Sequence, residues 1–300
     1  MEDVHGQIKP DNLRDWIQGE RFRSFTNENI FFCKTEHVND FFINCDKNKP
    51  FILISHCSDG SVTDNPRAYN YLESYHHADV RLMPDNCKKW FACMVDYDGY
   101  EDKRIVPLPL GVENNINFIN EGKRDILINE MNKKVEKYED KLVFVNFKIS
   151  NNYSERIDAF NSVKDTNFCT FTECMFTQEQ LDKPKELFPH INKLNYADFA
   201  SEIHKHYFML CPVGNGLDSH RLWEALHLNC IPITRRITNY IQYEDKLPIL
   251  FVDNWSDITK ELLLQKKEEI RIKKESGFYN MNMLNFSYWE NLIEDEYKKI

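Results

Sequence analysis

The chain lacks the features that mark several protein classes. No apolar stretch approaches the ~18–20 residues of a membrane helix, and residues 1–20 are polar and charged, without the apolar segment of a signal peptide. Internal repeats, low-complexity segments and Cys-x-x-Cys pairs are also missing. We therefore expect no integral membrane segment, no zinc site and a cytoplasmic protein. The nearest metal-ligand pattern, His204-x-His206, is more typical of a solvated helix.

An excess of positive charge is absent as well. The 38 basic residues face 48 acidic ones, for a net charge of −10. General nucleic-acid binders present a basic face, so we expect no nucleic-acid partner. One diphosphate bound through a local basic cluster stays compatible with this balance. The nine cysteines, several of them inside apolar runs, are expected to be free thiols in a reducing compartment.

What the chain does contain is enough apolar material for a substantial core. Its 300 residues are 42% hydrophobic, which suits two modest α/β domains or one large one. Apolar runs predict strands at 50–56, 80–83, 141–147, 168–171 and 247–252, and helical patterns lie at 156–160, 196–206 and 258–275. Residues 87–94 resemble edge structure, and the two prolines in 105–111 exclude a central strand there. Such alternation favours parallel α/β layers.

A charged helical stretch at 121–140 separates the two halves of the chain. We place the domain boundary near 130–140, which gives an N-terminal acceptor-side domain at 1–135 and a C-terminal domain at 136–275. Residues 276–300 form the tail, which carries several apolar side chains at helical spacing.

The segment 207–234 carries the densest chemistry in the chain. Phe208–Leu210 continues a buried-strand pattern, which Pro212, Gly214 and Gly216 then break. Glycines allow left-handed backbone angles and the close approach of a ligand. A helix follows with Asp218 or Ser219 as its N-cap, and another strand begins at Ile231.

A helix that starts after a glycine loop directs free N–H groups and the positive end of its dipole toward an anion. Arg221, one turn in, adds charge-assisted hydrogen bonds of about 1.5–3 kcal/mol each. Glu224, one turn further, has acceptors for the two hydroxyls of a ribose. The alternative is a surface ion pair worth about 0.2–0.5 kcal/mol. The acid lies C-terminal to the base, which is the weaker orientation, so we predict a site for a phosphate and a ribose.

Residues 208–232 resemble the C-terminal domains of the exostosin-like glycosyltransferases. The family pattern joins Phe-x-Leu-x-Pro-x-Gly, a Ser/His-Arg pair, a Trp-Glu-Ala-Leu-type helix and a Cys-Ile-Pro strand. The matching residues are Phe208, Pro212, Gly214, Asn215, Gly216, Asp218, His220, Arg221, Trp223, Glu224, Ala225, Leu226, Cys230, Ile231 and Pro232. The likeness extends more loosely to 142–147 and 105–111. A weaker likeness to α-1,3-fucosyltransferases also exists.

The resemblance implies a GT-B-like fold, in which two Rossmann-like domains face a cleft and a C-terminal helix crosses back onto the first domain. It implies a metal-independent transfer, with no cofactor, of a sugar from a nucleotide-diphosphate donor to a hydroxyl of a glycan, protein or lipid. UDP-sugars are favoured by the exostosin-like pattern, and GDP-sugars stay open through the fucosyltransferase likeness. Many relatives are luminal and membrane-anchored, so this chain is either a cytosolic form or a trimmed one.

The donor site is expected to draw on two loops. Gly214, Asn215, Gly216, Asp218 and the Ser219–His220 backbone cradle the diphosphate beside Arg221 and Glu224. After the strand at 141–147, Asn146, Lys148 and Arg156 are candidates to meet the phosphates. Arg156 is preferred, because a planar guanidinium binds phosphate oxygens in pairs. A solvated side chain is the alternative for each. Arg235 and Arg236 stay undecided between cleft and solvent.

The catalytic base is expected on the acceptor side. Ligands of open α/β sheets bind at the carboxyl ends of strands. Asp59 is the first candidate and His56 the second, because both follow a strand of the acceptor-side domain and a base must reach the acceptor hydroxyl. A plain Ser-Asp-Gly turn is the alternative for Asp59. Glu113 is the third candidate, in a Pro-x-Gly-x-Glu run that lines the cleft in the resembled family.

A second class of function stays open. A transferase-like fold does not guarantee activity, so the alternative is an inactive nucleotide-sugar-binding or scaffold module. The intact Arg221 and Glu224 speak against that alternative.

Overall fold

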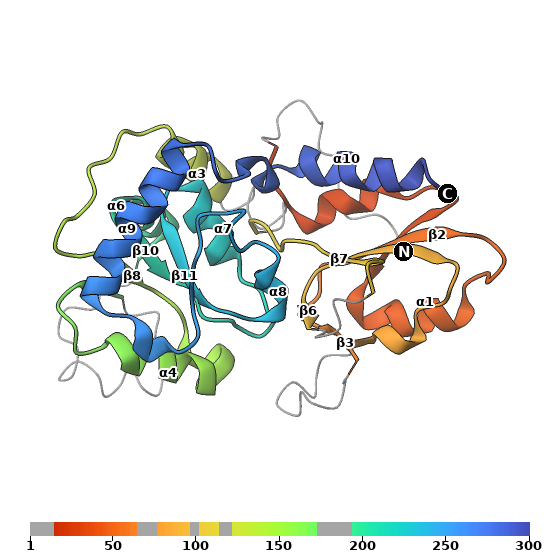
Figure 1. The fold of residues 1–300 in the computed structure, drawn as a ribbon, viewed down its shortest axis with the longest axis horizontal. Helices are drawn as coiled ribbons and strands as arrows, with labels where there is room; N and C mark the ends of the chain where they lie inside the picture. The colour runs from red at the N-terminus through yellow and green to blue at the C-terminus, as the bar shows by residue number, and fades with distance from the viewer. Residues whose placement is uncertain (1–14, 65–76, 97–101, 114–121, 173–193) are drawn as a thin grey trace.

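The computed structural model describes residues 15–64, 77–96, 102–113, 122–172 and 194–300. These residues form three parallel β-sheets with helices packed against them, which confirms the expected α/β class (Figure 1). We call residues 15–113 the N-terminal unit and residues 122–275 the C-terminal unit. The two units lie at opposite ends of the long axis of the molecule. None of the helices within the described ranges combines the length and apolar character that a membrane crossing requires.

The N-terminal unit is built on one main sheet and a smaller one. The main sheet has the order β1-β2-β5-β7 and the smaller one the order β4-β3-β6. The strands are β1 (Ile30–Lys34), β2 (Phe51–His56), β3 (Val62–Thr63), β4 (Ala78–Asp79), β5 (Cys87–Ala92), β6 (Val95–Asp96) and β7 (Ile105–Pro107). Leu53 of β2 packs with α1 (Val38–Asn44), whereas Ile52 and Ile54 belong to the core on the other face. Both faces are covered, which explains why β2 is buried along its whole length.

Two sequence expectations for this unit need correction. Residues 80–83 do not form a strand, because Val80–Leu82 is a 3-10 helix whose N-cap, Asp79, accepts a hydrogen bond from the Arg81 N–H. Residues 87–94 are not edge structure either, since β5 pairs with β2 on one side and β7 on the other. The edge position falls to β7, as the prolines in 105–111 require.

The C-terminal unit has a sheet with the order β12-β11-β10-β8-β9. Its strands are β8 (Val143–Val145), β9 (Cys169–Phe171), β10 (Phe208–Leu210), β11 (Ile231–Arg235) and β12 (Leu250–Val252). The chain leaves β8 toward β9 on one side, then crosses to β10 on the other side and continues outward. The crossovers therefore diverge between β8 and β10, and such a switch point is where open α/β sheets bind ligands.

Alternate strand residues of this sheet serve two separate cores. Phe144 and Met209 pack toward α6 (Tyr196–Lys205) and α7 (His220–His227), whereas Val143, Val145, Phe208 and Leu210 pack toward α4 (Tyr153–Val163) and α9 (Lys260–Glu275). The period-2 alternation of side chains in a strand explains this division. Asn195 caps α6 by accepting a hydrogen bond from the Asp198 N–H.

Short helices complete the described elements. They are α8 (Thr238–Ile241), η2 (Gly19–Phe25), η3 (Thr35–His37), η5 (Val80–Leu82), η6 (Ile149–Asn152), η8 (Trp255–Asp257) and η9 (Met281–Leu284). The eight cysteines in the described residues form no disulfide, and Cys174 lies outside those residues.

The C-terminal helix α10 (Phe286–Tyr297) lies along the N-terminal unit (Figure 1). The Ser287 N–H donates to Asp15 Oδ1 over 2.9 Å, and the Phe286 ring lies 4.9 Å from that of Phe22. On the other side, α3 (Lys123–Met131) packs against α6, with Glu130 Oε1 3.3 Å from His204 Nδ1. The chain thus passes to the C-terminal unit before residue 123, earlier than the expected boundary after residue 135.

Backbone groups of the N-terminal unit bind side chains of the C-terminal unit directly. The Leu110 N–H donates to Asp218 Oδ2 over 3.0 Å, and His220 Nδ1 lies 2.8 Å from the Gly111 carbonyl oxygen. The Val95 N–H donates to Asn239 Oδ1 over 3.0 Å. One hydrophobic cluster also runs through both units. The two units are therefore held together around the region where the strands of both sheets end.

Candidate functional site

A cavity of about 920 Å³ lies between the units, at the carboxyl ends of β2, β8 and β10. Ligand pockets span roughly 300–1,000 Å³, so its size suits a ligand larger than a single sugar. Its lining includes thirteen of the fourteen site residues expected from the sequence, and His56 is the exception. Those thirteen are Asp59, Glu113, Asn146, Lys148, Arg156, Gly214, Asn215, Gly216, Asp218, Ser219, His220, Arg221 and Glu224.

The glycine turn after β10 is tight and carries Asn215 at its tip. The Gly214 N–H donates to the Gly216 carbonyl over 3.1 Å. The expectation that these glycines adopt left-handed angles is wrong, because neither has a positive φ. The lack of space for a side chain explains why both positions are glycine. A Cβ on Gly214 would lie 2.6 Å from Arg156 Nη2, and one on Gly216 would lie 2.8 Å from Met94 Cε.

Arg156 fastens this turn to the loop after β8. Its side chain is buried, with Nε donating to the Val213 carbonyl over 2.9 Å and Nη1 donating to the Lys148 carbonyl over 2.7 Å. Burial, together with the charge of Arg221, lowers the pKa of Arg156 to about 9, so the guanidinium stays protonated at neutral pH. Two of its N–H groups thus bind carbonyl oxygens of the two loops, so Arg156 acts as a clamp that holds the loops together. Its positive charge also remains at the cavity.

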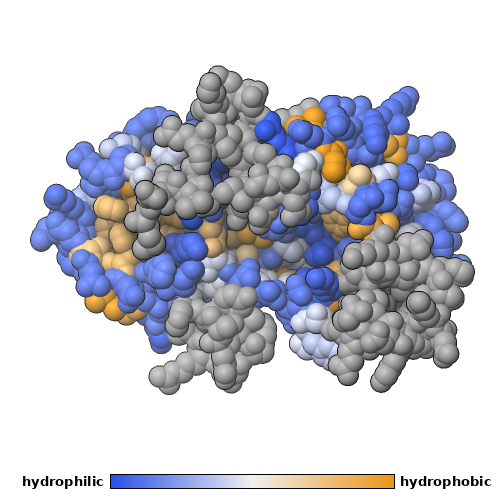
Figure 2. Space-filling view, turned by 180° about the vertical axis from the view of Figure 1, so that it is seen from behind, coloured by the Kyte–Doolittle hydropathy of each residue, from blue (hydrophilic) through white to orange (hydrophobic). Residues whose placement is uncertain are grey.

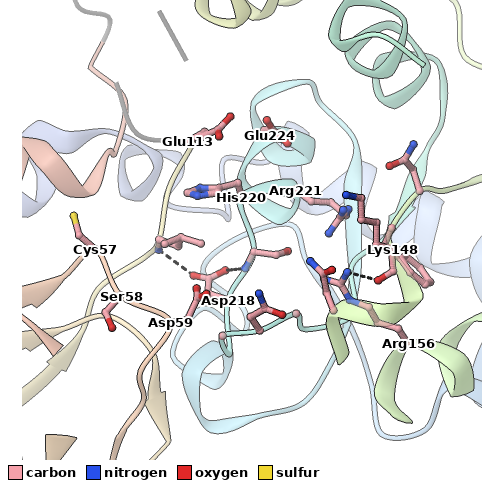
Figure 3. A pocket seen from close by; sticks show the side chains of 18 of the residues that line it. Cys57, Ser58, Asp59, Glu113, Lys148, Arg156, Asp218, His220, Arg221 and Glu224 are labelled. Carbon is pink, nitrogen blue, oxygen red and sulfur yellow. Dashed lines mark hydrogen bonds between the residues drawn. The ribbon is translucent and has the colours of Figure 1, made fainter. Parts of the chain in front are cut away.

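Arg221 brings a second guanidinium to the same cavity. Figure 3 shows Arg221 and Lys148 reaching toward the same end of the cavity, with Arg156 nearby. No acidic side chain in the described part of the chain forms an ion pair with Arg221, and its Nε is shielded without a hydrogen-bond partner there. Since two arginines without an acid repel each other, an anion bound between them would lower the electrostatic energy.

The first turn of α7 faces this basic end. Ser219 is the N-cap residue, but its hydroxyl does not cap the helix. The Ser219 Oγ is shielded and lacks a partner among the described residues, although the residue lines the cavity. Free N–H groups at a helix start and a hydroxyl without a partner are donors for an anion. Asn146, which also lines the cavity, donates from Nδ2 to Thr172 Oγ1 over 2.6 Å.

Glu224 lies one turn further along α7 and is buried at the cavity wall. Its Oε1 accepts a hydrogen bond from the Tyr196 hydroxyl over 2.8 Å. Burial raises the pKa of Glu224, although the Tyr196 bond and the charges of His220 and Arg221 oppose that rise. The tyrosine fixes the carboxyl group in place. Nothing near Glu224 in the sequence indicates Tyr196, which comes from a different helix.

Asp218 lines the cavity but offers no free oxygen to a ligand. Its carboxylate accepts hydrogen bonds from the N–H groups of Leu110 and Ser219, from Trp223 Nε1 and from the Tyr240 hydroxyl, at 2.7–3.0 Å. The expectation that Asp218 contacts the donor therefore gives way to a structural role. It joins the start of α7 to the backbone of the N-terminal unit.

The N-terminal unit supplies the opposite, acidic wall. Asp59 Oδ1 lies 3.4 Å from the position of a Cβ on Gly216, so this carboxylate faces the glycine turn. Glu113 lies near His220 in Figure 3, and its Oε2 accepts a hydrogen bond from Lys123 Nζ over 2.9 Å. Glu36 and Cys57 also line the cavity and were not anticipated. Burial, with Glu20 nearby, raises the pKa of the Cys57 thiol to about 12, so it stays protonated.

His56 does not fit the role of a catalytic base. Its ring is buried, the Cys57 N–H donates to Nδ1 over 2.7 Å, and Nε2 lies 3.1 Å from the Pro109 carbonyl oxygen. Both nitrogens are therefore occupied, with the proton on Nε2. Burial lowers the pKa of His56 to about 4. The residue supports the loop behind the cavity and does not face its interior.

Arg235 and Arg236, left undecided by the sequence, lie outside the cavity lining. Arg235 pairs with Glu155 over 3.0 Å, and Arg236 pairs with Asp253 and Glu244. No group of three or more His, Cys, Asp or Glu side chains within the described ranges is arranged to hold a metal ion. His204 contacts Glu130, and His206 contacts the Glu202 carbonyl. Compared with known proteins, the chain matches no family model and no curated protein.

Proposed function

We propose that this protein is a glycosyltransferase that moves a sugar from a nucleotide-diphosphate donor to a hydroxyl of a glycan, protein or lipid. One observation carries the proposal. A cavity between two parallel α/β units holds an arginine, Arg221, that forms no ion pair with an acid of the described residues, beside a glycine turn and a helix start. The buried carboxyl group of Glu224 lies one helical turn away.

The proposed donor lies along the C-terminal side of the cavity, with its diphosphate and its ribose in different places. The diphosphate lies at the glycine turn and the start of α7, where backbone N–H groups and Arg221 offset its charge. The ribose hydroxyls donate to Glu224, which Tyr196 holds in place. During transfer the diphosphate gains negative charge as it leaves, and preorganised cations are the usual means of stabilising such a leaving group.

The acceptor lies against the N-terminal unit. The cavity opens between the two walls, so a hydroxyl bound near Glu113 faces the sugar held by the C-terminal unit. The paired α/β units and the return of α10 to the N-terminal unit support the GT-B arrangement that we propose. The proposal favours UDP-sugars over GDP-sugars, on the strength of the exostosin-like pattern in residues 208–232.

The first experiment tests nucleotide binding. Thermal unfolding is measured with UDP, GDP, ADP, inorganic pyrophosphate and no ligand. A ligand at about 100 times its Kd stabilises a protein by about 2.7 kcal/mol, so the preferred nucleotide raises the Tm clearly. Nucleotide release from a panel of UDP- and GDP-sugars, with mixed glycan acceptors, then tests transfer. Binding without release supports the inactive module, and the absence of both overturns the proposal.

Arg221→Ala tests the observation that carries the proposal. Removing its charge-assisted hydrogen bonds, worth about 1.5–3 kcal/mol each, weakens nucleotide-diphosphate binding by roughly 10- to 150-fold. Arg236→Ala is the matched control, because Arg236 pairs with acids outside the cavity. Isothermal titration with the nucleotide found above measures both variants. Equal affinity in the two variants contradicts the donor-site assignment.

A further inference from the structure

His220 begins α7, and its ring reaches toward the opposite wall of the cavity. Its Nδ1 lies 2.8 Å from the Gly111 carbonyl oxygen. A carbonyl oxygen accepts hydrogen bonds and cannot donate them, so Nδ1 carries the proton of this bond. The neutral ring therefore has its lone pair on Nε2. This backbone contact from the N-terminal unit fixes both the tautomer and the ring orientation.

Nε2, the remaining nitrogen, belongs to a ring that lines the cavity beside the N-terminal wall, where we place the acceptor. His220 lines the cavity, and Figure 3 shows its ring on the side of α7 that faces Glu113, away from Lys148 and Arg156. A neutral imidazole that presents a lone pair accepts a proton well and binds a phosphate oxygen poorly. The ring thus differs from its neighbour Arg221, which presents only donors.

We infer that His220, through Nε2, is the catalytic base that takes the proton of the acceptor hydroxyl. This inference rests on the proposed glycosyl transfer and adds to it a single-displacement mechanism. As the hydroxyl proton moves to Nε2, the acceptor oxygen forms a bond to the anomeric carbon of the donor sugar. The bond between that carbon and the phosphate oxygen breaks, and its electron pair leaves with the nucleotide diphosphate. The imidazolium then releases its proton to water.

The geometry favours His220 over the two carboxylates of the acidic wall. Glu113 is committed to Lys123 Nζ at 2.9 Å. Asp59 lies against the glycine turn, where we place the diphosphate. Neither is oriented by a backbone group as His220 is. The titratable and charged groups around the His220 ring are Glu224, Arg221 and Asp218 on its own segment, Glu113 after β7 and His56 at the end of β2.

His220→Asn is the decisive variant. The amide Nδ2 of asparagine takes the place of Nδ1 and keeps a donor for the Gly111 carbonyl, while the base is removed. Positioned bases contribute typically 10²–10⁴-fold to rate, so kcat is expected to fall by at least about 100-fold. The nucleotide Kd and the Tm stay close to those of the unaltered protein. His227→Asn, on the same helix but outside the cavity lining, is the matched control and keeps its kcat.

Two further readouts separate a base from a structural role. Free imidazole added to His220→Ala restores a measurable part of the transfer rate, which it does not do for Arg221→Ala. The kcat/KM of the unaltered enzyme is expected to fall at acid pH, because a base must be unprotonated to take the proton of the hydroxyl. The residual kcat/KM of the His220→Asn variant does not show this fall at acid pH.

The outcomes are distinct for the two proposals. Transfer by His220→Asn at more than about a tenth of the normal rate overturns the assignment of the base, and so does a tenfold weaker nucleotide affinity with unchanged kcat, which indicates a phosphate ligand. Failure of the unaltered protein to bind nucleotide overturns the proposed function and the base together. Loss of kcat with normal binding and imidazole rescue supports both.

Discussion

The two walls of the cavity come from similar parallel α/β units but differ in their charged side chains. The C-terminal wall brings Lys148, Arg156 and Arg221 beside the buried carboxyl groups of Asp218 and Glu224, whereas the N-terminal wall, among its described lining residues, brings the carboxylates of Glu36, Asp59 and Glu113 and no cation. In both units the lining residues follow the carboxyl ends of strands, as open α/β sheets generally allow. The shared architecture therefore places the cavity at strand ends of both units, and the side chains after each strand set the charged groups of each wall.

The walls also differ in how far apart in the sequence their polar residues lie. On the C-terminal wall, residues 214–224 supply most of the polar groups from one continuous segment. The N-terminal wall collects residues from 36, 57–59 and 110–113, and its ordering depends on contacts with the other unit. A change at the link between the walls should consequently cost more than a change within either wall.

Asp218→Ala tests that link and has the largest expected effect. It removes the acceptor of four donors that include the Leu110 N–H and the Tyr240 hydroxyl. Each buried donor left without a partner costs about 1–3 kcal/mol, so unfolding is expected to become easier by on the order of 4 kcal/mol. Urea denaturation measures the change. Asp198→Ala, an exposed position on α6, is the control and costs less than about 1 kcal/mol.

A loss below 1 kcal/mol in Asp218→Ala would show that the two units do not depend on this carboxylate. The ordering of the N-terminal wall would then not depend on its contact with Asp218.

The buried ring of His56, behind the N-terminal wall, is expected to make the stability of the protein depend on pH. Its folded-state pKa of about 4 lies below the unfolded value near 6.5. The folded state therefore resists protonation, and the stability that the neutral ring contributes is present above pH 6.5 and lost as the pH falls toward 4. Linkage gives a loss of about 3 kcal/mol at pH 4. His56→Gln should flatten the stability profile between pH 6.5 and 4, as measured by urea denaturation. An unchanged slope contradicts the burial argument.

Arg156→Lys sharpens the comparison on the basic wall. Lysine keeps the charge but cannot place two donors on the Val213 and Lys148 carbonyls as the guanidinium fork does. The glycine turn then loses its clamp, and nucleotide affinity falls by roughly tenfold, or about 1.4 kcal/mol. Arg235→Lys, in an exposed ion pair of the same unit, serves as the control. Calorimetric titration measures both, and equal affinities would show that charge alone suffices at position 156.

Asp59→Asn tests the acidic wall and has the smallest expected effect. Because Asp59 faces the glycine turn, its charge opposes a bound diphosphate through partly solvated space. Removing that charge raises nucleotide affinity by about twofold at low salt, and less at high salt because of screening. Titration at two ionic strengths measures the change. Weaker binding in the variant would place Asp59 among the donor ligands.

The difference between the walls also explains what the sequence could predict. Residues 207–234 predicted β10, the glycine turn, α7 and the start of β11, because hydrophobic period, glycines and a cap follow one another within a short segment. The cavity residues in this segment could therefore be predicted from its own sequence. The alternation of strands and helices was likewise sufficient for the parallel α/β class.

Contacts between distant segments could not be predicted in the same way. The apolar stretch 50–56 correctly indicated β2, but only the fold shows that the Pro109 carbonyl and the Cys57 N–H occupy the ring of His56. The role of Asp218 depends in the same way on Tyr240 and Leu110. Tyr196, which orients Glu224, lies 28 positions away in the sequence. Hydrophobic period says nothing about such pairings.

The contact between residues 110–111 and α7 bears on how such a protein can diversify. The N-terminal unit uses main-chain atoms there, the Leu110 amide and the Gly111 carbonyl, to hold Asp218 and His220. Every amino acid except proline supplies the same amide, so position 110 can change its side chain, which faces the cavity, without releasing α7. Position 111 has no such freedom, since its φ is +73° and a Cβ would lie 2.1 Å from the Ile17 carbonyl oxygen. A substitution at residue 110 can thus reshape the cavity while the neighbouring glycine keeps the framework constant.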